Sequence, residues 1–198
     1  MKSLVLDTAW KNMLVGLYED GRLVAGSSQE AFKKQSETLF VELKKQLEQA
    51  GWKLQDVDEV IITDGPGSYT GLRIAMTAAK ILGTQGKMKV RTLSTLQLYA
   101  GADPCANVIL DARGGRVYAG CIENGKEVWK GILPLEQVDE FLAAHPGTLY
   151  GEGELIGKSA KPTDFLASAQ ALIDLARPVE DVDTLVPVYM KESARYLP

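Results

Sequence analysis

The sequence predicts an α/β protein built from two related halves, and three patterns lead to that prediction. Short apolar strands open the chain and precede an amphipathic helix over 36–50. A glycine-rich loop over 65–71 then joins a buried strand to a helix rich in alanine. A second series of strands over 108–133 repeats the opening arrangement. Strands that alternate with helices in this order favour the α/β class.

The first third of the chain is predicted to hold three strands and the helix. The strands are expected over 3–8, 13–18 and 22–28, with a hairpin turn at Glu19-Asp20-Gly21. Ser36 is a suitable N-cap for the helix, and Gly51 is a suitable C-cap.

The helix over 36–50 combines an apolar stripe with a polar face. The stripe consists of Leu39, Phe40, Leu43 and Leu47. The polar face is expected to meet solvent and consists of Glu42, Lys45, Glu48 and Gln49. The stripe can pack on the protein's own sheet or on a partner helix, and the sequence leaves both open.

The glycine-rich loop is the most informative segment. It follows a predicted strand over 60–63 and precedes a helix over 70–83, in which small alanine side chains would let helix axes approach closely. Gly65, Gly67 and Gly71 permit positive φ or close backbone approach. Such a loop can leave free N–H groups for an anion, although an ordinary turn explains it equally. Its spacing matches neither a P-loop nor Gly-x-Gly-x-x-Gly.

The second half is predicted to begin near residue 102 and to be shorter in structure. Strands are expected over 108–110, 117–123 and 127–133, with a turn at Asn124-Gly125. Helices are expected over 135–144 and 163–176, a strand over 148–151, and a C-terminal arm over 187–198. The first of these strands ends in Leu-Asp-Ala, as the strand over 3–8 ends in Leu-Asp-Thr.

Composition excludes several functional classes. The 198 residues carry a formal charge of −4, so strong tRNA binding by the chain alone is not expected. No apolar run approaches the roughly 20 residues of a membrane span, and no secretory signal opens the chain, which predicts a cytoplasmic protein. Cys105 and Cys121 fit no zinc or redox spacing, and the single His145 cannot form a histidine-rich metal site.

Asp7 and Asp111 are the candidate catalytic acids, because each ends a predicted strand. The glycines that follow Asp111 could partly wrap a phosphate, whereas Trp10 follows Asp7 where a phosphate would need room. Gly151 and Gly153 form a second candidate nucleotide turn, although the carboxylates beside them disfavour a phosphate. A strand-end cap or a salt bridge remains the alternative for both aspartates.

Residues 65–74, Gly-Pro-Gly-Ser-Tyr-Thr-Gly-Leu-Arg-Ile, resemble the signature of the bacterial TsaB (YeaZ) family, within the actin-like, sugar-kinase and Hsp70 ATPase superfamily. Further matching segments lie in the same order at 4–8, 36–39, 93–96, 108–113 and 187–191. The resemblance implies an actin-like ATPase (ribonuclease H-like) fold of two lobes. The N-terminal lobe, 1–101, would hold a mixed five-stranded sheet with the partner-binding helices. The abbreviated C-terminal lobe, 102–198, would end in the arm.

The resemblance also implies a role without bond chemistry. TsaB-like proteins support a catalytic TsaD subunit, together with the ATPase TsaE, in threonylcarbamoyl transfer to the adenosine beside the tRNA anticodon. The implied partners are a TsaD-like subunit, a TsaE-like ATPase, a second copy when the chain is alone, and tRNA only through the complex, with no membrane. No cofactor is expected to bind tightly, with weak ATP or ADP contact at the partner interface.

The partner interface implied for this chain lies on its first two helices and the glycine loop. It comprises Ser36, Leu39, Phe40, Leu43, Leu47, Gly65, Gly67, Gly71, Arg73, Ala75, Met76 and Ala79. The family commonly has His at the entry to the first helix, where this chain has Gln35. Two alternatives stay open: an independent actin-like small-molecule kinase or ATPase, and a glycoprotease-type metallopeptidase.

Overall fold

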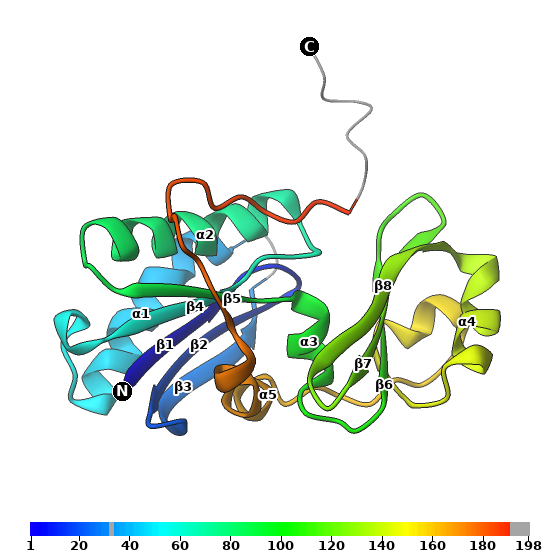
Figure 1. Cartoon of the computed structure of the whole chain (residues 1–198), viewed down its shortest axis with the longest axis horizontal. Coiled ribbons are helices and arrows are strands. Elements are labelled where there is room, and N and C mark those ends of the chain that lie inside the picture. Colours follow the sequence, from blue (N-terminus) through cyan, green and yellow to red (C-terminus); the bar gives the residue numbers. More distant parts are fainter. Residues whose placement is uncertain (32–33, 191–198) are drawn as a thin grey trace, which may run out of the picture.

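The computed structural model describes residues 1–31 and 34–190, so residues 191–198 of the predicted arm lie outside the described residues. Two β-sheets stand side by side, each with helices packed against it (Figure 1). The first sheet has the strand order β10-β5-β4-β1-β2-β3. Its strands are β1 (Lys2–Asp7), β2 (Asn12–Glu19), β3 (Arg22–Glu30), β4 (Glu59–Thr63), β5 (Lys89–Leu93) and β10 (Arg177–Pro178).

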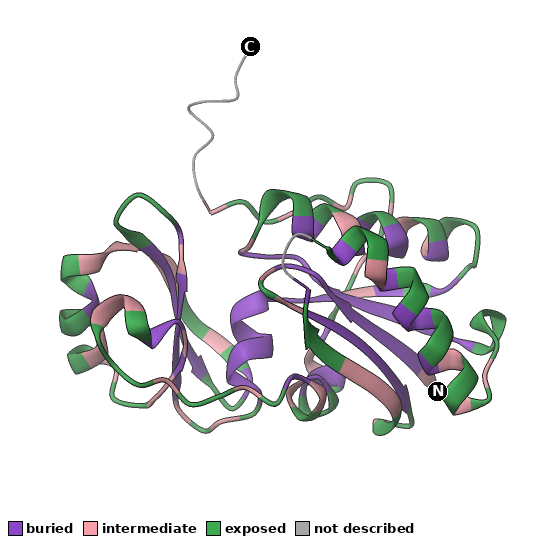
Figure 2. Cartoon of the chain, turned by 180° about the vertical axis from the view of Figure 1, so that it is seen from behind, coloured by how far each residue is buried: buried purple, intermediate pink, exposed green. Residues whose placement is uncertain are grey.

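Helices α1 (Gln35–Ala50) and α2 (Tyr69–Thr84) cover one face of this sheet. Their apolar residues form one core with alternate strand residues, including Leu4 and Leu6 of β1. Figure 2 shows the buried positions of both helices turned toward the sheet, with exposed positions along their outer faces. Ser68 caps α2 by accepting a hydrogen bond from the Gly71 amide at 3.3 Å.

The opposite face of the first sheet meets α3 (Thr95–Ala100) and α5 (Phe165–Leu172). Val5 of β1 points to this side and belongs to a core that continues into the second lobe through Val108 and Tyr118. The Tyr18 hydroxyl donates to the Leu166 carbonyl at 3.0 Å. The two lobes therefore share one hydrophobic core.

The second sheet repeats the first. Its strands are ordered β8-β7-β6-β9, and the first sheet contains the same run as β3-β2-β1-β4. In both runs the strand after the first is antiparallel and the last strand pairs in parallel. The repeat seen in the sequence is thus confirmed. The new elements are β6 (Ala106–Asp111), β7 (Arg116–Glu123), β8 (Lys126–Pro134) and β9 (Thr148–Gly151), with η2 (Leu135–Gln137), α4 (Val138–Ala144), η3 (Gly153–Ile156) and η4 (Ile173–Leu175).

Several expectations need correction. The first sheet has six strands rather than five, because β10 returns from the second half to pair with β5. Ser36 does not cap α1, which begins one residue earlier after Lys34, with no side-chain cap. Glu42 does not face solvent: it is buried and accepts a hydrogen bond from Gln46 at 2.6 Å. The domain limits at 101 and 102 stay a prediction, since α5 and β10 pack back on the first sheet.

Candidate docking face and strand-end site

Asp7 ends β1 and is buried. Its carboxylate accepts hydrogen bonds from the Thr63 hydroxyl and from the Ala9 amide, the latter at 2.9 Å. Burial raises the pKa of the Asp7 carboxyl above its usual value, while these hydrogen bonds oppose the rise. Asp7 therefore acts as a strand-end cap that ties the following turn to β4, which is the alternative that the sequence left open.

Asp7→Asn tests this role through pH. Since the folded state holds the proton more tightly than the unfolded chain, wild-type stability falls as pH rises from about 4 through the folded-state pKa. Asparagine keeps the acceptor oxygen and does not titrate. The free energy of unfolding of the variant should therefore gain on the wild type as pH rises, in urea titrations from pH 4 to 8. A difference that is independent of pH would refute the assignment.

The glycine loop packs directly on the turn after β1. The Ser68 amide donates to the Ala9 carbonyl at 2.8 Å, and the Thr8 hydroxyl donates to the Gly71 carbonyl at 2.6 Å. A Cβ at Gly71 would lie 2.2 Å from the Thr8 carbonyl oxygen, and one at Gly67 would lie 2.6 Å from that of Ala9. These glycines are needed for backbone packing, and that contact takes the space in which the turn could have cradled a phosphate.

A second set of contacts joins this turn to the other lobe. Lys11, after β1, forms a salt bridge with the largely buried Glu152, after β9. The other Glu152 oxygen accepts a hydrogen bond from the Asp111 amide at 2.6 Å. Glu152 thus faces a lysine and a backbone N–H of the chain itself. We call this group, Asp7 to Lys11 with Asp111 and Glu152, the strand-end site.

Aromatic side chains also fill the strand-end site. Trp10 packs edge-on against Tyr118 of β7, with ring centroids 6.3 Å apart. The side chain of Gln35, at the start of α1, donates to the Trp10 carbonyl at 3.0 Å. The side chain of Trp10 therefore occupies space beside the turn, as its bulk led us to expect.

The remaining nucleotide candidates have structural roles as well. The Asp111 carboxylate accepts a hydrogen bond from the Arg113 amide at 2.7 Å and caps β6. Gly151 has φ of +88°, and a Cβ there would lie 2.2 Å from the Ile109 carbonyl oxygen. A Cβ at Gly153 would lie 2.6 Å from the Lys158 carbonyl oxygen. Both glycines are explained by close backbone contact.

No three His, Cys, Asp or Glu side chains within residues 1–31 and 34–190 gather closely enough to hold a metal ion. His145 instead stacks near Trp129 and Phe141. Over the same stretches, every helix is too short or too polar to cross a membrane.

The predicted interface residues divide into two groups. Most of them are buried in the chain's own core and cannot form a contact surface as they stand, which corrects the prediction for Leu39, Leu43, Gly65, Gly71, Ala75, Met76 and Ala79. The apolar stripe of α1 therefore packs mainly on the sheet. Leu47 and Gly67 are half-buried, and the exposed candidates are Ser36, Phe40 and Arg73.

The outer face of α1 and α2 offers other side chains that the sequence pattern missed. Val41 lies off the stripe and is the most exposed apolar residue there, at 69%, beside Phe40 at 57%. Tyr69 and Ile81 of α2 are about half exposed. Four apolar side chains that face outward on two neighbouring helices are the signal of a contact surface. We call Phe40, Val41, Tyr69, Arg73 and Ile81 the docking face.

The C-terminal arm borders the docking face. The Val188 amide donates to the Asp64 carbonyl at 2.8 Å, and the ring of Tyr189 stacks on Tyr69 with centroids 5.3 Å apart. The Arg73 guanidinium lies 4.3 Å from the centre of the Tyr69 ring and donates to the Tyr189 hydroxyl at 3.3 Å. Tyrosine and arginine in this combination are frequent at the centres of protein interfaces.

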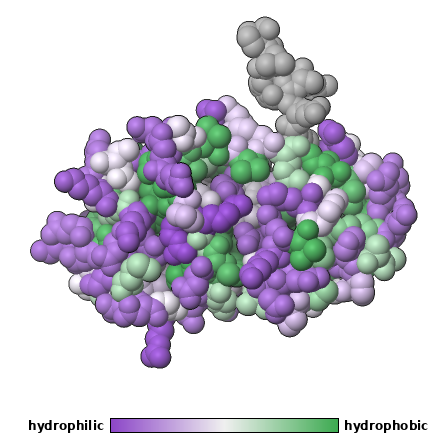
Figure 3. Space-filling view, viewed as in Figure 1, coloured by the Kyte–Doolittle hydropathy of each residue, from purple (hydrophilic) through white to green (hydrophobic). Residues whose placement is uncertain are grey.

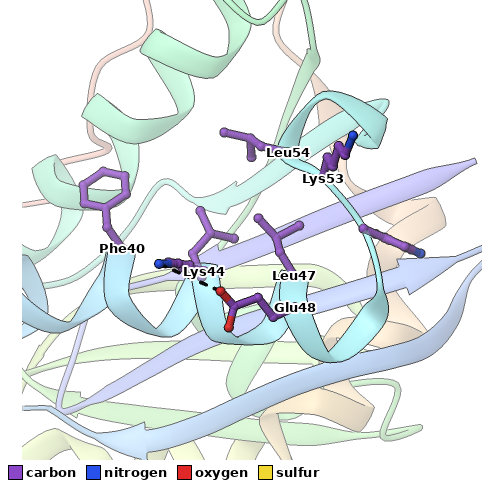
Figure 4. A pocket seen from close by; sticks show the side chains of 8 residues that line it. Phe40, Lys44, Leu47, Glu48, Lys53 and Leu54 are labelled. Carbon is purple, nitrogen blue, oxygen red and sulfur yellow. Dashed lines mark ion pairs between the residues drawn. The ribbon is translucent and has the colours of Figure 1, made fainter.

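An apolar groove runs along α1 beside η1 (Leu54–Asp56) and has a volume of about 330 Å³. Phe40 and Leu47 of α1 project into it on the same side, toward Leu54 (Figure 4). Leu43 and Trp52 also line it, with Lys44, Glu48 and Lys53. The surface shown in Figure 3 is mainly hydrophilic, with smaller apolar areas between the polar ones.

Comparison with known proteins gives a consistent family. Residues 28–181 match the family described as TsaD: tRNA N6-adenosine threonylcarbamoyltransferase. The tRNA threonylcarbamoyladenosine biosynthesis protein TsaB of Escherichia coli (strain K12) is 30% identical over 201 residues, which cover 94% of this chain and 82% of the relative. TsaB of Bacillus subtilis (strain 168) is 27% identical over 142 residues, covering 70% of this chain and 62% of the relative. The match thus spans less than two thirds of that relative's length.

Solved structures confirm the predicted fold. YeaZ from Pseudomonas aeruginosa superposes with a TM-score of 0.76 at 24% identity, covering 95% of this chain and 99% of that one. The ethanolamine utilization protein EutJ from Carboxydothermus hydrogenoformans gives a TM-score of 0.51 at 14% identity, covering 86% of this chain and 88% of that one. The two-lobed actin-like fold predicted from the sequence is therefore correct.

Proposed function

The chain belongs to the TsaB family of tRNA threonylcarbamoyladenosine biosynthesis proteins, and we propose that it is a non-catalytic subunit of the complex that makes this modification. Its main partner is a TsaD-like catalytic subunit, which transfers a threonylcarbamoyl group from threonylcarbamoyl-AMP to the adenosine beside the tRNA anticodon. A TsaE-like ATPase completes the complex in the cytoplasm, and tRNA binds only through the complex.

One contrast carries the proposal. The chain's own side chains and backbone fill the strand-end site, whereas the docking face leaves Phe40 and Val41 exposed. A protein that has filled the place for a phosphate and kept an exposed apolar helix pair is suited to binding another protein.

The match to the TsaD family supports a particular mode of pairing. If the catalytic partner has the same fold, its equivalent helices can meet α1 and α2 in a four-helix contact related by approximate two-fold symmetry. Without the partner, the same face serves a homodimer. Weak ATP or ADP contact would then belong to the interface between subunits.

Affinity capture from a lysate of the source organism tests the proposal. We expect a TsaD-like protein to co-purify in stoichiometric amount with this chain. The function would be wrong if the TsaD-like protein of the same organism, expressed together with the chain, elutes separately from it at micromolar concentration.

Titration with ATP and Mg²⁺ addresses the kinase or ATPase alternative. Because Glu152 already pairs with Lys11 and the glycine loop already packs on Ala9, we expect no heat of binding below millimolar nucleotide with the isolated chain. Binding at micromolar concentration that Asp111→Ala removes would favour the enzyme instead.

A further inference from the structure

The groove along α1 carries information about the chemistry of what it binds. Its floor is apolar, with Leu43 nearly buried and Phe40 and Leu54 partly exposed. The α1 residues that line it recur at 40, 43, 44, 47 and 48, which is one face of a helix. Such a seam is suited to another helix that inserts apolar side chains at the same spacing.

The rim of the groove is positively charged. Lys44 and Lys53 line it against a single acid, Glu48. The Lys44 ammonium lies 3.9 Å from the Glu48 carboxylate with both side chains well exposed, so this pair contributes little. Lys53 has no ion-pair partner within the part of the chain that the structure describes. Around this groove the lysines therefore outnumber the acid in a chain whose overall charge is negative.

A third lysine reinforces the rim. The Lys2 ammonium lies 4.5 Å from the centre of the Trp52 ring, which is one wall of the groove. A cation over the ring face is attracted by its negative quadrupole, so Lys2 helps to hold this wall in place. The charge it adds has the same sign as that of Lys44 and Lys53.

We infer that the groove binds an amphipathic helix of the partner subunit that carries a large apolar side chain flanked by carboxylates. The inference rests on the proposed function and adds the chemistry of the partner segment. A second copy of this chain fits less well, because a two-fold contact through this groove would bring the same lysines together. Charges on a rim mainly change the rate of association and its dependence on salt.

Association kinetics with the co-expressed TsaD-like partner test the inference. The charge-reversed variant is Lys44→Glu with Lys53→Glu. Its matched control is Lys89→Glu with Lys126→Glu, which makes the same change in net charge at exposed positions outside the groove. We expect the groove variant to associate about tenfold more slowly in 50 mM NaCl and to lose most of its salt dependence, while the control changes less than threefold.

Salt should also affect the two assemblies in opposite directions. Raising NaCl from 50 to 300 mM should weaken association with the partner and strengthen any homodimer, as measured by sedimentation. Equal slowing by both charge variants, or no slowing by either, would overturn the inference and leave the proposed function intact. If the wild-type chain does not bind the partner at any salt concentration, the proposed function itself fails.

Discussion

Phe40→Asp combined with Val41→Asp is expected to weaken binding of the TsaD-like partner by at least about 100-fold while the chain stays folded. Both side chains are more than half exposed, so the change removes little buried area from the free protein. In the complex the two carboxylates would lose water in an apolar contact without a cation to pair with. Titration calorimetry and thermal unfolding measure the two effects separately.

Val128→Asp is the matched control for this double variant. Val128 is 58% exposed on β8 of the second sheet, away from α1 and α2. It should leave partner affinity within about twofold of the wild type. Equal losses from the control and from the double variant would place the interface elsewhere. Leu43→Arg would be a poor test, because Leu43 is 5% exposed in the core beneath α1 and its change would unfold the chain.

Gly71→Ala is expected to destabilise the fold by about 3 kcal/mol or more. The new Cβ would lie 2.2 Å from the Thr8 carbonyl oxygen, so one of two backbone segments must move. That movement breaks the hydrogen bond from the Thr8 hydroxyl to the Gly71 carbonyl. Urea unfolding followed by circular dichroism measures the loss.

Gly21→Ala controls for the general effect of replacing a glycine. Gly21 has φ of +74° in the hairpin turn between β2 and β3, and a Cβ there would meet no other atom within 4 Å. The variant should cost only the roughly 1 kcal/mol of a left-handed backbone. A Gly71→Ala loss no larger than that of Gly21→Ala would mean that the loop does not depend on this close contact.

The fold could be predicted from local pattern because its elements are locally consistent. The turns at Glu19-Asp20-Gly21 and Asn124-Gly125 supply the positive φ angles that tight hairpins need. The repeated Leu-Asp strand ends predict two related sheets. The strands over 89–93 and 177–178 escape prediction because the first is short and partly charged and the second contains proline.

The candidate site is harder to predict, since its contacts join distant segments. Nothing local indicates that Glu152 receives Lys11, or that Trp10 meets Tyr118. The stripe of α1 is visible in the sequence, but the same spacing describes a core face and a partner face. Only the fold reveals that Leu43 faces the sheet and Val41 faces outward.

Reconstitution of threonylcarbamoyl transfer to tRNA with the TsaD-like and TsaE-like proteins distinguishes a binding subunit from an enzyme. For a binding subunit, we expect Asp111→Ala to support transfer within about twofold of the wild type, while the Phe40→Asp and Val41→Asp double variant lowers the rate by more than tenfold. Loss of transfer with Asp111→Ala, together with full transfer by the double variant, would show instead that the chain works through its strand-end site.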